Sequence, residues 1–184
     1  MKKLLLKVLI FTAVLTFSGI SHLFGADRSP INVNLIIDGS SAFSAVKADV
    51  TAWLTGRLDQ ILADGDRVTI WSAGSSEAKV VYTGTMSAAA DRDAAKKSIR
   101  DLTGSGTQAD FSGALRGAAN LQASGYSYTL MICASNSALS NLLSGSQSAL
   151  MRFSRVDDFS GWKAIVVGLN IDARVKRSAA AFFQ

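Results

Sequence analysis

The stretch that decides the fold is LIIDGSSAFSAV, residues Leu35 to Val46. An apolar run ends at Asp38, and glycine and serine follow before the pattern becomes that of a helix. This junction has two interpretations. Asp and Ser side chains commonly accept hydrogen bonds from the free N–H groups at a helix start. The carboxyl end of a strand is also where open α/β sheets bind ligands, so Asp38 could instead belong to a metal or anion site.

Hydrophobic periodicity divides the rest of the chain into strands and helices. Strands are expected at residues 31–37, 66–72, 78–83, 126–133 and 162–169. Helices are expected at residues 42–63, 87–100, 111–123, 138–153 and 174–183. The second and third strands are separated by Gly74-Ser75-Ser76, which favours a hairpin.

This alternation of strands and helices predicts an α/β fold. The first strand begins with alternation and ends fully apolar, and the buried strands are continuous rather than alternating, which is typical of a parallel sheet covered by helices on both faces. We therefore expect a three-layer, Rossmann-like, doubly wound sheet that is mostly parallel, with one antiparallel edge strand from the hairpin. A single domain over residues 29–184 suits a chain of 184 residues.

The first residues, MKKLLLKVLIFTAVLTFSGISHLFGA, have the pattern of a secretory signal peptide. Two lysines precede an apolar run, and small residues follow it. We expect a leader over residues 1–26, although cleavage after Ser21 is an alternative. A retained membrane anchor is the other interpretation, but the apolar run is short for a membrane span. Cleavage would leave no membrane span and would place the protein in the periplasm or outside the cell.

The basic character of the chain comes mainly from this leader. Of the 19 basic residues, Lys2, Lys3 and Lys7 lie in it, which leaves 16 basic residues against 14 acidic ones. Nucleic-acid binding requires a clustered basic face, and no such cluster stands out. We therefore expect no nucleic-acid partner.

Catalytic residue pairs are missing from the sequence, so we expect no enzyme and no catalytic residues. The only histidine, His22, falls in or beside the leader, and Ser40 and Ser135 have no evident general base. Cys133 sits in an apolar run and is expected to be a buried small hydrophobe. The tryptophans are expected to pack in the core rather than to stack on a ligand; they are Trp53, Trp71 and Trp162.

Three polar loops follow central strands or open the adjoining helices. They contain Asp38–Ala42, Gly104–Thr107 and Ala134–Ser137. In a doubly wound sheet such loops converge on one crevice. Their carboxylate and hydroxyl oxygens are ligands that suit a hard cation such as Mg²⁺.

This pattern resembles the von Willebrand factor A (vWA) domain family, over nearly all of the chain from about Ile31. That family has Asp-x-Ser-x-Ser after the first strand, a threonine after a glycine-rich turn, and an aspartate after the fourth strand. Asp38, Ser40 and Thr107 match three of these positions. Ala42 replaces the second serine, so the metal-ion-dependent adhesion site is degenerate.

The expected aspartate after the fourth strand is also missing, because Ser135-Asn136 stands there. The resemblance implies that Asp38, Ser40 and Thr107 would hold a metal. With one carboxylate, we expect weakly bound Mg²⁺ or Mn²⁺, or no cofactor at all. A metal-free structural role of Asp38 remains the alternative.

The resemblance further implies an exported module that binds another protein. Its contact residues would lie in the same loops and include Ser41, Ser105, Ser135 and Asn136. The alternative is a structural or assembly component of the cell envelope with a vestigial metal site, whose contacts lie elsewhere, such as on the helix at 174–183. A hydrolase is a third alternative that the missing catalytic pairs disfavour.

Overall fold

The computed structural model describes residues 29–75, 77–121, 127–136 and 162–168, and for the last range the backbone only. The predicted leader and the helices expected at 138–153 and 174–183 lie outside these residues.

The described strands form one sheet in the order β3-β2-β1-β4-β5. Their bounds are β1 Asn32–Asp38, β2 Arg67–Ala73, β3 Ala78–Thr85, β4 Ser127–Cys133 and β5 Trp162–Gly168. β1 pairs in parallel with β2 and β4, and β4 pairs in parallel with β5. The hairpin makes β3 antiparallel to β2. The prediction of a mostly parallel sheet with an antiparallel edge strand is confirmed.

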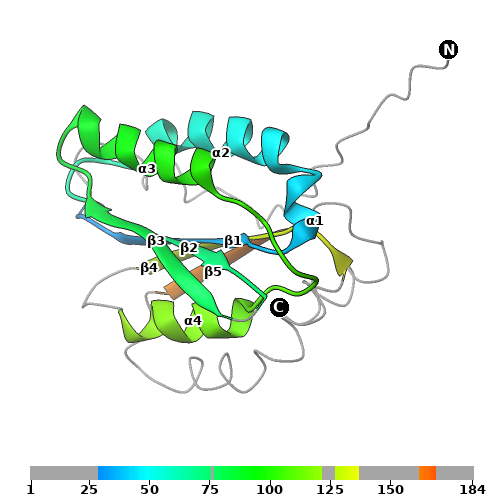
Figure 1. Ribbon diagram of the computed structural model, residues 1–184. Helices are drawn as coiled ribbons and strands as arrows, with labels where there is room; N and C mark the ends of the chain where they lie inside the picture. The colour runs from blue at the N-terminus through cyan, green and yellow to red at the C-terminus, as the bar shows by residue number, and fades with distance from the viewer. Residues whose placement is uncertain (1–28, 76, 122–126, 137–161, 169–184) are drawn as a thin grey trace, which may run out of the picture.

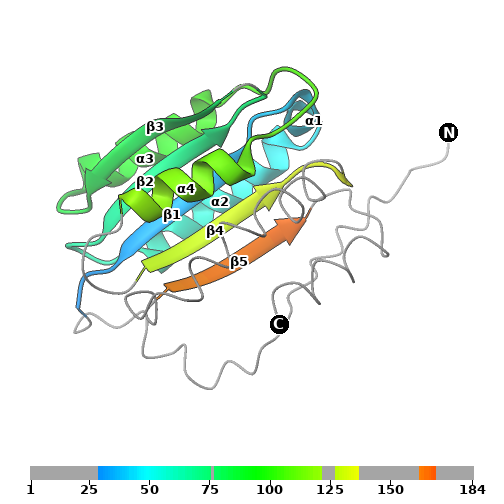
Figure 2. The same cartoon turned by 90° about the horizontal axis from the view of Figure 1, so that it is seen from below.

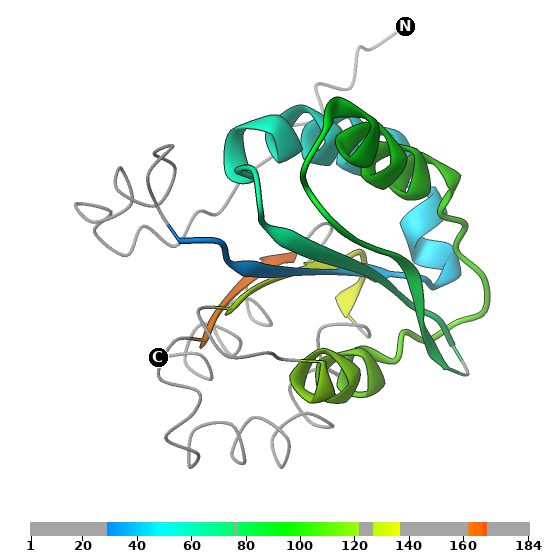
Figure 3. The same ribbon diagram turned by 90° about the vertical axis from the view of Figure 1, so that its left-hand side faces the viewer.

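Helices cover both faces of this sheet. Their bounds are α1 Ser41–Ser44, α2 Lys47–Ile61, α3 Ala89–Asp101 and α4 Phe111–Asn120. The helices α2 and α3 lie side by side on one face, and α4 lies on the other (Figures 1 and 3). The predicted three-layer α/β arrangement is therefore confirmed. Among the described helices, none has the length and apolar character required to cross a membrane.

The core forms two layers because successive strand residues point to opposite faces of a sheet. In β1, Val33, Leu35 and Ile37 belong to the layer beneath α2 and α3. Ile36 belongs to the layer beneath α4, together with Phe111. This explains why β1 is fully apolar from Leu35 to Ile37, since both of its faces are covered.

The helix expected over residues 42–63 is wrong as a single element. The backbone at Val46 has φ −117° and ψ 1°, which separates α1 from α2. In α1, the Ser41 N–H donates to the Gly106 carbonyl at 2.8 Å, and Phe43 is fully buried. The first turn is therefore held by a loop distant in the sequence, and apolar spacing within one segment does not reveal such a contact.

The expected core position of Trp53 is also wrong. Its side chain is 36% exposed, whereas Trp71 is buried as predicted. The core side of α2 is made by Val50, Leu54 and Leu58, which recur at helical spacing. Trp53 precedes Leu54 by one residue and is thus turned about 100° away from it.

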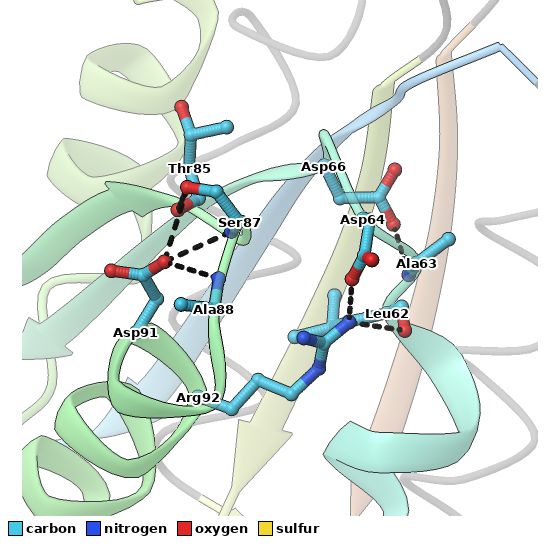
Figure 4. A network of polar contacts seen from close by, with 9 residues as sticks. All are labelled: Leu62, Ala63, Asp64, Asp66, Thr85, Ser87, Ala88, Asp91 and Arg92. Carbon is cyan, nitrogen blue, oxygen red and sulfur yellow. Dashed lines mark hydrogen bonds and ion pairs between the residues drawn. The ribbon is translucent and has the colours of Figure 1, made fainter.

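Two carboxylates organise the end of the sheet opposite to Asp38. Asp66 is buried and accepts the N–H of Ile31 at 3.0 Å and that of Ala63 at 2.8 Å. Asp91 Oδ2 accepts the N–H groups of Ser87 and Ala88 at 2.9 and 2.8 Å, and the Ser87 hydroxyl at 3.1 Å (Figure 4). The two bonds from Ser87 and Ala88 N–H are the main reason why the pKa of Asp91 is lowered. The start of α3 is therefore capped by Asp91, with Ser87 as a donor.

Candidate functional site

Asp38 ends β1 at the centre of the sheet, and its side chain is only 1% exposed. One carboxylate oxygen accepts the N–H of Ser40 at 2.8 Å. The other accepts the N–H of Ala134, directly after β4, also at 2.8 Å. Asp38 therefore joins the first and third of the predicted loops through two charge-assisted hydrogen bonds.

The second loop is joined to the first by backbone hydrogen bonds. The Ser105 N–H donates to the Gly39 carbonyl at 2.8 Å, and the Ser41 N–H donates to the Gly106 carbonyl at 2.8 Å. A side chain at Gly104 would place its Cβ 2.0 Å from the Ser40 carbonyl oxygen. Glycine is required there because the two backbones approach so closely. The structure thus brings all three predicted loops together.

Ser40 lies inside this junction, and its side chain is 2% exposed. Its hydroxyl has no hydrogen-bond partner among the described residues. A buried hydroxyl without a partner is unfavourable, so this oxygen has a capacity for a ligand or a water molecule. Thr107 directly follows Gly106 and is exposed to solvent.

The residues present match a hard cation in the kind of donor but not in charge. Asp38, Ser40 and Thr107 supply carboxylate and hydroxyl oxygens, as Mg²⁺ prefers. Asp38 contributes the single negative charge, and both of its oxygens already accept an N–H. In the described part of the chain no three His, Cys, Asp or Glu side chains gather in a metal-binding group. Such a donor set suits weak binding at most.

The four residues predicted to contact a partner lie around this junction. Ser41 and Ser105 are exposed, and Ser135 and Asn136 are partly exposed at the end of β4. The sequence could not reveal the role of the Ala134 N–H, because a backbone donor has no residue signature. The Ser135-Asn136 pair, which replaces the expected aspartate, did indicate that this segment belongs to the site. It gave no sign of the hydrogen bond from the Ala134 N–H to Asp38.

Cys133 precedes Ala134 and is fully buried. Burial raises the pKa of its thiol, and the nearby Asp38 carboxylate raises it further. The thiol therefore stays protonated and out of reach of solvent. This confirms the prediction that Cys133 packs as a small hydrophobe.

No protein-family model and no curated protein sequence matches the chain. Its fold is similar to that of the N-terminal domain of TFIIH p34, with a TM-score of 0.54 and 16% identity over 86% of this chain and 90% of that one. It is also similar to proximal thread matrix protein 1 from the mussel byssus, with a TM-score of 0.56 and 12% identity over 84% of this chain and 39% of that one. At such identities the likeness is one of fold, and it supports the Rossmann-like α/β arrangement.

Proposed function

We propose that the chain is an exported protein-binding module that contacts its partner through the loops at the carboxyl end of the sheet. The observation that carries this proposal is the junction of three separate loops around Asp38. Around its buried centre, Ser41, Ser105 and Thr107 are exposed to solvent. A rigid backbone that presents polar side chains loses little entropy on binding, which favours recognition.

Metal dependence is the finer part of the proposal. Asp38, Ser40 and Thr107 would hold Mg²⁺ or Mn²⁺ weakly, and an acidic residue of the partner would complete the shell. The unpartnered Ser40 hydroxyl supports this assignment. When bound, the cation would supply the positive charge that attracts a partner carboxylate. Of the three assigned ligands, Asp38 alone is charged, and its charge is negative.

A second candidate is a structural or assembly component of the cell envelope with a vestigial metal site. The two hydrogen bonds of Asp38 favour it, because they give the carboxylate a complete structural role without any metal. In this case the partner surface would lie away from the three loops.

Affinity capture followed by binding measurements distinguishes these candidates. The chain is cross-linked to its neighbours in intact cells, and the captured protein is then purified. A variant with Ser41→Ala, Ser105→Ala and Thr107→Ala should bind that protein about tenfold more weakly or worse, because each lost hydrogen bond contributes about 1 kcal/mol. Thr85→Ala, which removes an exposed threonine at the opposite end of the sheet, should bind like the unmodified chain. If the unmodified chain, the triple loop variant and Thr85→Ala bind the partner equally well, the second candidate is favoured.

Calorimetric titration with Mg²⁺ and Mn²⁺ tests the metal separately. Weak binding that is lost in Ser40→Ala and Thr107→Ala, but kept in Thr85→Ala, would support the assigned ligands. Absence of heat in the unmodified chain would remove the metal from the proposal, whereas the loop variant would still test partner binding.

A further inference from the structure

The turn between β2 and β3 lies at the same end of the sheet as the three loops. Asp38 pairs with Ala73 in the parallel register of β1 and β2, so β2 ends beside the first loop and the turn follows directly. The structure describes Gly74, Ser75 and Glu77 of this β2–β3 turn. The three predicted loops do not include it.

Backbone hydrogen bonds attach the end of β2 and the turn to two of the loops. The Gly39 N–H of the first loop donates to the Ala73 carbonyl at 2.9 Å. The Asp110 N–H, at the end of the second loop, donates to the Gly74 carbonyl, also at 2.9 Å. Figure 2 shows the second loop, between α3 and α4, curving around this end of the sheet. The β2–β3 turn is therefore a fourth member of the loop junction.

Ser75 packs directly on the second loop. A Cβ added to Gly106 would lie 2.6 Å from the Ser75 Cβ, and the backbone of Gly106 has φ +71°. Both the contact and the left-handed backbone require glycine at this position. The next residue is the exposed Thr107. The turn thus supports the loop backbone beside a residue that the proposed function uses for contact.

The four loops have negative charge and no basic residue. Their described residues are 38–42, 74–75, 77, 103–110 and 134–136, and the charged ones are Asp38, Glu77 and Asp110. Asp38 is buried with both oxygens bonded, and Asp110 accepts the N–H of Gly113 at the start of α4. Glu77 is exposed. Of these carboxylates, Glu77 is therefore the one most open to a partner.

Several carboxylates of α2, α3 and the segment after α2 have a different environment, because a base neutralises each of them. The pairs are Asp59 with Lys96, Asp64 with Arg92, and Asp101 with Lys97. Glu77 forms no ion pair among the described residues, not even with Lys79, the basic residue nearest to it in the sequence. The loop end of the sheet thus presents a negative charge that no described base balances.

We propose that the β2–β3 turn is part of the partner-binding surface, and that Glu77 binds a basic side chain, lysine or arginine, of the partner protein. This inference rests on the proposed protein-binding function of the loops and adds the chemistry of the partner. Opposite charges across an interface select the correct partner and accelerate association, whereas an acidic group opposite Glu77 would be repelled. The contact needs no metal, since it is made at the turn and not at Asp38.

Titration of the purified chain, without the predicted leader, with short peptides tests the charge preference by NMR of the backbone amides. Tetralysine should shift the amides of Ser75, Glu77 and Thr107, whereas tetraglutamate should not. Glu77→Gln should lose these shifts, because it removes the charge and keeps the size. Asp93→Asn makes the same change of charge on the exposed part of α3 and should keep them. Equal shifts in Glu77→Gln and the unmodified chain would overturn the proposal.

The protein captured by cross-linking provides the second test. Glu77→Gln should bind it about threefold more weakly, because an exposed ion pair contributes little, and Glu77→Lys about tenfold more weakly, because like charges then meet. Glu77→Asp keeps the carboxylate and should bind nearly as well as the unmodified chain. Rising salt should weaken the binding of the unmodified chain more steeply than that of Glu77→Gln, since salt screens the pair. A merely structural role of Glu77 would not change this salt dependence.

The same measurements separate the failure of this inference from the failure of the loop function. If the triple loop variant binds the captured protein as well as the unmodified chain does, the loop function fails, and this inference fails with it. If the triple variant binds weakly, but Glu77→Gln and Glu77→Lys keep full affinity and the same salt dependence, the loop function stands. That result would overturn the role of Glu77 and the basic partner group.

Discussion

Asp38 shows how much of this fold depends on single hydrogen-bond acceptors. Its two oxygens join Ser40, two residues ahead, to Ala134, which is 96 residues away. The helix-cap interpretation holds only in part, because Ser40 is the N-cap residue of α1 but its side chain makes no capping bond, and Asp38 accepts the N–H of Ser40 itself. The buried Ser40 hydroxyl, which has no partner among the described residues, leaves the metal interpretation open. The bond to Ala134 belongs to neither interpretation. It is a tertiary contact that closes the loop junction.

Replacing Asp38 should therefore destabilise the chain. Asp38→Ala leaves two buried N–H groups without an acceptor, and we expect a loss of about 3 kcal/mol in the free energy of unfolding. Asp38→Asn keeps one acceptor oxygen and should lose less. Urea denaturation measures both, with Asp49→Ala on the exposed part of α2 as the control. A stability of Asp38→Ala equal to that of the control would show that the two bonds contribute nothing.

At the scale of the elements, two helical glycines have opposite surroundings. Gly117 in α4 lies against Trp71 of β2, so that an added Cβ would come within 2.4 Å of the indole ring. At Gly56 in α2, an added Cβ would have no atom within 4 Å apart from those of its chain neighbours and its own helix backbone. Gly117 is therefore required for the packing of α4 on the sheet. Gly56 has no such role and only lowers the helix propensity of α2.

Alanine substitutions should separate these two cases. Gly56→Ala should stabilise the chain by about 0.5–1 kcal/mol, because alanine has the higher helix propensity. Gly117→Ala gains the same propensity but forces α4 away from the buried Trp71, and we expect a net loss of about 1–3 kcal/mol from overpacking. Thermal unfolding monitored by circular dichroism measures both variants. Stabilisation by Gly117→Ala would mean that α4 can shift on the sheet without loss.

For the whole molecule, the order of the strands predicts a gradient of stability. β1 is paired on both sides and is covered on both faces, whereas β3 is paired with β2 and has mostly exposed residues. The free energy of local opening rises with the number of contacts that must be broken, so the amides of central strands should exchange last.

Hydrogen exchange at low protein concentration should reveal this gradient. The amides of β1 should exchange most slowly and those of β3 most rapidly among the strands β1, β2 and β3. The mass increase of peptides from each strand measures the rates, with unfolded chain as the reference for intrinsic exchange. Equal rates in β1 and β3 would indicate that the sheet opens as one unit.

Most of the fold could be predicted because its signals are local. The apolar run before Asp38, the helical spacing of Val50, Leu54 and Leu58, and the turn residues before β3 each report on their own segment. The wrong predictions, the single helix over residues 42–63 and the core position of Trp53, concern features that depend on contacts with distant segments. The break at Val46 accompanies the bond between Ser41 and Gly106, and the solvent position of Trp53 depends on which side of α2 meets the sheet.

By itself, the sequence determined the α/β class, the mostly parallel sheet with its antiparallel hairpin, and the three polar loops, two of which carry Asp38, Ser40 and Thr107. Apolar periodicity and turn residues are properties of short segments, so they can be recognised without knowledge of the rest of the chain. Only the tertiary structure decided that both oxygens of Asp38 are engaged, that the Ser40 hydroxyl is buried without a partner among the described residues, and that the β2–β3 turn joins the loop junction. Each of these facts depends on strand register and on contacts between residues far apart in sequence, which no local pattern encodes.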